Sequence, residues 1–75
     1  MLKPRIKDKI HINDFVEPEL DYFRLNCNFS EQELQYFNLR ARQKSNVQIA
    51  LEMHVSESKV SKLARKVKDK MKRVL

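Results

Sequence analysis

The sequence predicts an all-α fold: a small tetrahelical bundle with an N-terminal arm and a short extra helix. Apolar residues recur at intervals of three and four in several segments, the period of a helix with one buried face. Ser30, Ser45 and Ser56 stand directly before three of these segments, where a serine side chain caps a helix N-terminus. A chain of 75 residues makes one small domain with a modest core and little room for a deep enzyme cleft.

Residues 1–13 are expected to form an extended arm that packs on the domain or on a partner chain. Ile6 and Ile10 have helical spacing, whereas Ile10 and Ile12 alternate as in a strand. The pattern therefore gives no regular element, and disorder at the extreme terminus is the alternative interpretation.

The next segment is expected to be a short helix capped by Asp14. Pro18 falls in its first turn, where a missing N–H costs nothing. Asn28 suits the turn that ends the helix, because Asn tolerates left-handed backbone geometry. Three apolar positions recur at helical spacing: Leu20, Phe23 and Cys27.

A capping box begins the next helix, which is expected to run to about Arg42. Ser30 and Glu33 have the S-x-x-E spacing in which each side chain bonds the other residue's backbone N–H. Phe29 is placed to staple against Leu34. The expected buried stripe consists of Leu34, Phe37 and Ala41, broadened by Tyr36 and Leu39.

A helix of about eight residues is expected after Ser45, which has Gln48 three positions on as a second capping pair. A small side chain, Ala50, would permit a close crossing with another helix. His54 stands where a tight turn usually has Gly, so it is expected to adopt left-handed backbone geometry. The apolar residues of this segment are Val47, Ile49, Ala50, Met53 and Val55.

The last helix is expected from about Glu57 to Arg73, with Ser56 as its cap. Its second half is rich in lysine and arginine, which suit a helix C-terminus. Its buried stripe is expected to contain Val60, Leu63, Ala64, Val67, Met71 and Val74.

A short helix, a tight corner and a longer helix with a basic outer face form the arrangement of a helix-turn-helix. We therefore expect residues 57–66 to act as a recognition helix in the major groove of double-stranded DNA. The side chains expected to contact base edges are Ser58, Lys59, Ser61, Lys62 and Arg65. Those expected to contact phosphate are Arg42, Lys44, Ser45, Asn46 and Lys66. A merely solvated polar helix face is the alternative interpretation.

The distribution of charge favours a polyanionic partner. Residues 1–28 carry five basic and five acidic side chains, whereas residues 29–75 carry eleven basic and five acidic ones. The whole net charge of +6 therefore lies on the part that contains the predicted helix-turn-helix.

Other functional classes find little support in the sequence. Cys27 is the single cysteine and is expected to be a small buried hydrophobe in a reducing, cytoplasmic setting. His11 and His54 lack partners at metal-ligand spacing, and the chain has no glycine for a phosphate-binding loop. We expect no enzyme activity, no cofactor, no metal, no signal peptide and no membrane-spanning segment.

Residues 29–71 resemble the LuxR/FixJ-type helix-turn-helix domain and, nearly as well, region 4 of sigma factors. The resemblance lies in the Ser30–Glu33 box and in the pattern S-N-x-x-I-A…V-S-x-x-x-V from Ser45 to Val60. Gln43 and His54 depart from it at positions usually occupied by Gly, and Lys44 departs at a position that is often apolar.

The resemblance implies a DNA-binding domain over residues 29–75, preceded by the arm and short helix of residues 1–28. It also implies transcription regulation, as a small stand-alone bacterial or phage regulator. A homodimer through the last helix is expected to use Val67, Met71, Val74 and Leu75. The alternative function is a protein-interaction module of the same fold, which docks on RNA polymerase as sigma region 4 does.

Overall fold

The computed structural model describes residues 11–75, which fold into helices joined by short connections. A 3₁₀ turn, η2, covers Ile12–Asp14, and four α-helices follow: α1 (Glu17–Asn26), α2 (Glu31–Ala41), α3 (Asn46–Met53) and α4 (Glu57–Val74). This confirms the predicted all-α class. The interpretation of residues 1–10 as an arm lies outside the described residues, whereas Ile12 is buried in the core.

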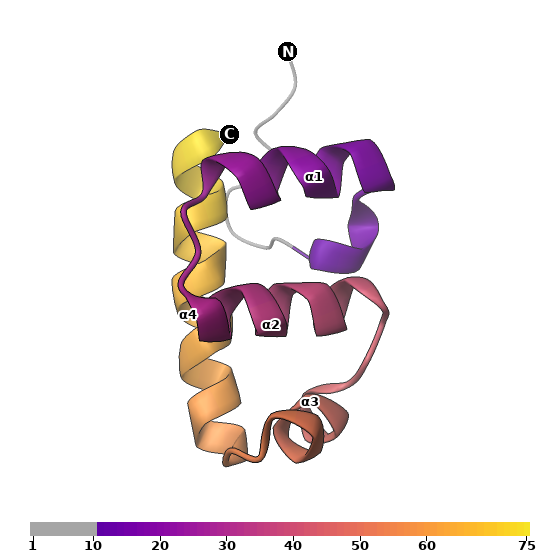
Figure 1. Ribbon diagram of the computed structural model, residues 1–75, viewed down its shortest axis with the longest axis vertical. Helices are drawn as coiled ribbons and strands as arrows, with labels where there is room; N and C mark the ends of the chain where they lie inside the picture. Colours follow the sequence, from indigo (N-terminus) through magenta and orange to yellow (C-terminus); the bar gives the residue numbers. More distant parts are fainter. Residues whose placement is uncertain (1–10) are drawn as a thin grey trace.

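Helix α4 runs the full height of the molecule in Figure 1, and the other helices pack along it. Helices α1 and α2 cross it one above the other and run in opposite directions, while α3 lies below α2 at the beginning of α4. Helix α4 therefore contributes to the packing of every other α-helix, and its two halves have different neighbours.

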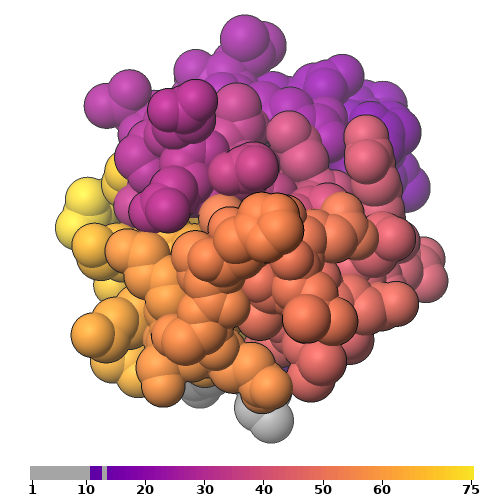
Figure 2. Space-filling model, turned by 60° about the horizontal axis from the view of Figure 1, so that its bottom comes forward, coloured from indigo at the N-terminus to yellow at the C-terminus, as the bar shows by residue number. Residues whose placement is uncertain are grey.

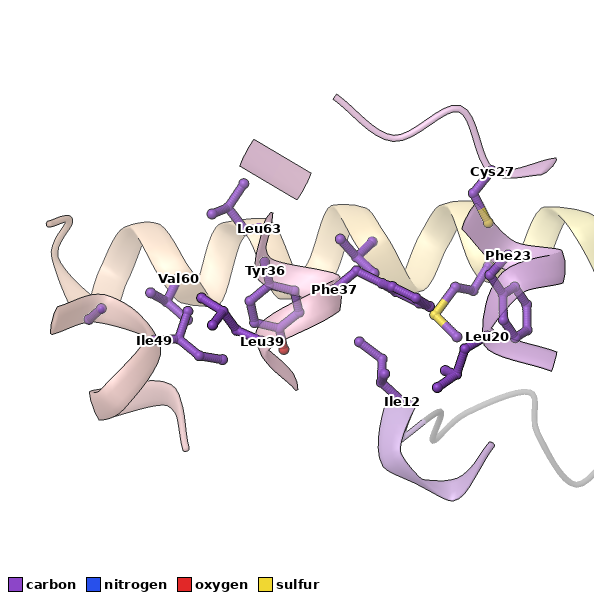
Figure 3. Packing of buried hydrophobic residues seen from close by; sticks show 13 residues of the cluster. Ile12, Leu20, Phe23, Cys27, Tyr36, Phe37, Leu39, Ile49, Val60 and Leu63 are labelled. Atoms are coloured by element: carbon purple, nitrogen blue, oxygen red, sulfur yellow. The ribbon is translucent and has the colours of Figure 1, made fainter. Parts of the chain in front are cut away.

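One continuous core fills the space between these helices. At one end of it Ile49 and Val60 pack near Leu39, and at the other end Leu20 and Phe23 lie near Cys27, with Phe37 between the two groups (Figure 3). The thiol of Cys27 is buried, as expected, and burial raises its pKa although Lys70 opposes the shift. Residues of η2 and α1 thus share a core with the three helices that follow.

The structure confirms three of the four predicted helix starts. The hydroxyl oxygens of Ser30, Ser45 and Ser56 each accept a hydrogen bond from the backbone N–H three residues on, at 3.1–3.2 Å. The prediction for Asp14 is wrong, because this residue lies in η2 and Val16 precedes α1. Valine has no side-chain acceptor, so the only side-chain bond at this start is from the Val16 N–H to the Glu19 carboxylate, at 2.9 Å.

The buried face of α2 is rotated from the predicted one. Leu34 is 36% exposed and Ala41 is half-buried, whereas Tyr36 and Phe37 are almost fully buried. Phe29 stacks on Phe37 with the ring centroids 5.0 Å apart, and Glu33 lies on the buried side. A Lys70 ammonium group that reaches Glu33 from α4 makes that position suitable for a carboxylate.

The buried side of α4 follows the predicted stripe. Val60, Leu63, Val67 and Met71 are buried, and Ala64 and Val74 are half-buried. The side chains of Val67 and Met71 are buried in the core of one protomer. Only Val74 and Leu75 of the four proposed dimer residues remain accessible.

Candidate nucleic-acid interface

Helices α3 and α4 are joined by a corner of three residues, His54–Val55–Ser56. His54 adopts φ 59° and ψ 44°, the left-handed geometry predicted for it. The Val55 N–H donates to the Ala50 carbonyl at 3.0 Å, which closes the end of α3, and Ser56 then caps α4. Val55 is half-buried against the core, so the corner is held by hydrogen bonds and by packing.

A second corner connects α2 to α3. Gln43 adopts φ 66°, again at a position where a glycine would be expected, and its N–H donates to the Arg40 carbonyl. The Arg40 guanidinium reaches across this corner and donates to the Lys44 carbonyl at 2.7 Å. The position of α3 is therefore fixed at both ends by local hydrogen bonds.

All five side chains expected to contact base edges are exposed on α4: Ser58, Lys59, Ser61, Lys62 and Arg65. In an α-helix, residues three or four positions apart lie on one side. Two rows of polar side chains therefore run along the outer side of α4, in which Lys68 and Lys70 are half-buried, and Glu57, Asp69 and Arg73 are exposed beside them. The first row contains Ser58, Ser61, Arg65, Lys68 and Lys72, and the second contains Lys59, Lys62, Lys66 and Lys70.

The two rows have different neighbours. Lys68 of the first row shares a surface pocket with Arg40 of α2 and Asn46 of α3. Lys70 of the second row donates to the Asn28 carbonyl at 3.0 Å and to the Glu33 carboxylate at 2.6 Å. The first row thus adjoins the α2–α3 corner, and the second row leads to the beginning of α2.

The beginning of α4 and the neighbouring α3 together form one continuous, convex surface (Figure 2). No deep cleft separates the two helices in this view. A surface of this shape presents its side chains outward.

The predicted phosphate contacts divide between the two sides of this surface. Arg42, Ser45 and Asn46 are exposed at the α2–α3 corner, next to the first row, whereas Lys66 belongs to the second row. The Ser45 hydroxyl caps α3 but retains its own O–H as a donor. Lys44 is half-buried and its ammonium group lies 3.1 Å from the Glu52 carboxylate, so its charge is already partnered.

The electrostatic character of α4 is one-sided. The helix contains eight lysine or arginine residues and two acidic ones, Glu57 and Asp69. Among the residues that the structure describes, Lys70 is the only α4 cation within 4.0 Å of a carboxylate. The seven other cations lie on α4 without such a partner, which produces a strongly positive outer face.

Sequence reasoning did not identify Arg40, Lys68 and Glu52 as parts of this region. Arg40 supports the α2–α3 corner, Glu52 partners Lys44, and Lys68 extends the first row. Lys68 could have been found from the sequence, because its spacing from Ser61 and Arg65 places it on the same side of the helix. The other two act through contacts between different elements, which periodicity does not reveal.

The structure was also searched for metal-binding groups and membrane-spanning helices, and the chain was compared with known proteins. Within residues 11–75, no group of three or more His, Cys, Asp or Glu side chains is placed to hold a metal ion. Over the same residues, none of the helices combines the length and the apolar character that crossing a membrane requires. Comparison with protein-family models, curated proteins and solved structures found no match for this chain.

Proposed function

We propose that this chain is a sequence-specific double-stranded DNA-binding protein that regulates transcription, with the first half of α4 in the major groove. The observation that carries the proposal is the pairing of two capped helices around a three-residue corner with a cationic face on the second helix, of which only Lys70 has a carboxylate within 4.0 Å among residues 11–75. A major groove about 12 Å wide admits one α-helix, and the convex surface of α3 and α4 has a suitable shape.

The positions of the side chains support a division of roles. Ser58, Lys59, Ser61 and Lys62 lie in the first two turns of α4, which enter the groove most deeply in helix-turn-helix complexes. Lys and Arg donate to guanine O6 and N7, and Ser serves either as donor or as acceptor. Arg65, one turn further along, completes the base-reading set.

The phosphate contacts would then lie on both sides of the recognition helix. Arg42, Ser45 and Asn46 adjoin the first row of α4 and would meet one DNA strand, and Lys66 in the second row would meet the other. The free N–H groups at the start of α3 favour an anion at the same place. Two strands flank a major groove, so contacts on both sides fit a duplex.

The test is binding of the 75-residue chain to duplexes selected from a random pool, measured across a range of salt concentrations. We expect Lys59→Glu with Lys62→Glu to abolish binding. Loss of a phosphate contact such as that of Lys66 should instead leave binding measurable and lower the log–log salt slope by about 0.9. The matched control is Lys72→Glu with Arg73→Glu, which makes the same change of charge at the far end of α4 and should retain sequence preference.

Two results would refute DNA binding. One is an absence of binding at low salt, and the other is an equal loss of affinity in both double variants, which would show only nonspecific charge attraction. Ser61→Ala adds a specificity test, because it should change the preferred bases with little effect on the salt slope. A palindromic selected site would support a homodimer, for which Val74 and Leu75 are the accessible candidates.

A second candidate function is docking on a protein such as RNA polymerase. It is favoured by Val47 and Leu51, which lie one turn apart on α3 and are 51% and 70% exposed. Exposed apolar side chains grouped on one helix are typical of protein contacts. Binding of purified RNA polymerase that is lost in Leu51→Ser, together with weak DNA binding, would favour this function over the first.

A further inference from the structure

A small polar pocket lies where η2, α2, α3 and α4 meet, beside the first row of α4. Its volume is about 80 Å³. Ile12 and Ala64 supply apolar walls, and the polar side chains that line it are His11, Tyr36, Arg40, Asn46 and Lys68. None of these described lining residues is a carboxylate, although the pocket contains two permanent cations.

Several hydrogen-bond donors in this pocket are free to bind a ligand. Arg40 uses one nitrogen for the Lys44 carbonyl, which leaves most of its five N–H donors for other partners. Asn46 is the first residue of α3, so its backbone N–H has no partner within the helix. For the Lys68 ammonium, no carboxylate within 4.0 Å and no hydrogen-bond partner occur among residues 11–75.

Tyr36 adds a hydroxyl group to the wall of the pocket. The residue is only 2% exposed, and its hydroxyl forms none of the side-chain hydrogen bonds found among residues 11–75. Figure 3 shows this hydroxyl on the side of α2 on which Ile12 lies. Burial raises the pKa of Tyr36, with an opposing effect of Arg40, so the hydroxyl keeps its proton and can donate.

We infer that this pocket binds a single phosphate group, held by Arg40, Lys68, Tyr36 and the start of α3. Its volume accommodates a group of several atoms, such as a phosphate, and excludes a whole nucleoside. Charge-assisted donors from a guanidinium, an ammonium and a helix N-terminus are the groups that recognise phosphate. The group has two sources, a DNA backbone phosphate or a small phosphorylated solute, and only the first rests on the proposed function.

The first experiment tests the pocket without DNA. Inorganic phosphate is titrated into the full chain, with chloride at matched ionic strength as the reference, and the Asn46 amide is followed by NMR. We expect a saturable shift, a rise of about tenfold in the dissociation constant for Lys68→Gln, and a smaller rise for Tyr36→Phe. Lys72→Gln is the matched control, one turn further along the same row and outside the pocket, and should change it less than about twofold.

Two outcomes of the phosphate titration would contradict the proposal. No phosphate-specific shift in the unmodified protein would overturn the inference, and so would an equal weakening by Lys68→Gln and Lys72→Gln. Arg40→Gln is a less suitable variant, because Arg40 also holds the α2–α3 corner.

The second experiment identifies the source of the phosphate group. If a DNA phosphate occupies the pocket, a duplex displaces inorganic phosphate, and Lys68→Gln lowers the salt slope of DNA binding by about 0.9. An unchanged slope, with phosphate still bound beside DNA, assigns the pocket to a small phosphorylated solute. Absence of any DNA binding would refute the proposed function, while the phosphate titration would still decide the pocket.

Discussion

At the scale of single residues, this chain builds left-handed turns without glycine. The sequence contains no Gly, and Asn28, Gln43 and His54 have φ of 55°, 66° and 59°. Each directly follows or closely follows a helix end, where a left-handed residue redirects the backbone. Asn tolerates this geometry best, whereas Gln and His retain a steric conflict between Cβ and the following carbonyl.

His54→Gly is therefore expected to stabilise the fold, because glycine removes that conflict at the corner of the helix-turn-helix. The gain should be about 0.5–1 kcal/mol, since the greater entropy of unfolded glycine offsets part of the relief. Urea unfolding gives the change in free energy. Asn28→Gly is the matched control and should gain less, and a loss of stability in His54→Gly would show that the imidazole makes a contact of its own.

The sequence predicted these residue-scale features unevenly. The left-handed geometry of His54 and the exposure of the five base-edge candidates followed from local pattern. The Arg40–Lys44 bond and the pairing of Lys44 with Glu52 did not, because the first depends on the backbone path of the α2–α3 corner and the second on how that corner packs beside α3. Asp14 was wrongly predicted as a cap because a polar residue near a helix start does not by itself fix where the first turn begins.

At the scale of elements, one ionic contact joins three segments of the chain. The Lys70 ammonium group of α4 contacts the Glu33 carboxylate of α2 at 2.6 Å and the Asn28 carbonyl of the α1–α2 connection at 3.0 Å. Glu33 also accepts from the Ser30 N–H at 2.9 Å, so the same carboxylate completes the capping box. Its side chain is 7% exposed, and these bonds explain why a carboxylate is tolerated there.

The pH dependence of stability should report this contact. Burial raises the pKa of Glu33, but the bonds from Lys70 and Ser30 outweigh it and leave the pKa below the usual 4.5. A lowered folded-state pKa stabilises the protein above about pH 4.5, and that stabilisation is lost as pH falls through the folded-state value. We expect Glu33→Gln to cost about 2 kcal/mol at pH 7.

The difference in unfolding free energy between Glu33→Gln and the unmodified protein should shrink as pH is lowered below 4.5. Urea unfolding at several pH values measures it. Glu31→Gln is the matched control, since it removes the same charge from an exposed position in the same first turn. A difference that stays constant down to pH 3 would contradict the assignment.

At the scale of elements, the sequence predicted correctly those features that depend on residues close together in the chain. The three serine caps and the stripe of α4 are short-range patterns, and the structure confirms both. The face of α2 was predicted one position away, because two adjacent apolar residues, Tyr36 and Phe37, leave the centre of a stripe ambiguous. Packing of Phe37 against Phe23 of α1, with centroids 6.3 Å apart, resolves it, and α1 lies outside the α2 sequence window.

At the scale of the whole molecule, the residues before α2 are part of the same core as the helix-turn-helix. Ile12 of η2 is 2% exposed, and Leu20 and Phe23 of α1 are similarly buried. Phe15 packs edge-on against Phe23 with the ring centroids 5.0 Å apart. The predicted boundary at residue 28 therefore separates segments by sequence pattern, while the core runs across it.

This continuity predicts that Ile12 contributes to the stability of the whole fold, including the distant α3–α4 corner. Ile12→Ala should cost about 3 kcal/mol, because it removes buried methyl groups and leaves a cavity in a core that helix α2 also lines. Leu25→Ala is the matched control: Leu25 is 83% exposed on α1, and its truncation should change stability by less than about 0.5 kcal/mol. Thermal unfolding followed by circular dichroism, with an NMR reporter at Val55, distinguishes a cooperative loss from a local one. If Ile12→Ala unfolds η2 and α1 while Val55 keeps its stability, residues 29–75 form an independent domain; a single transition shared by both probes would show one cooperative unit.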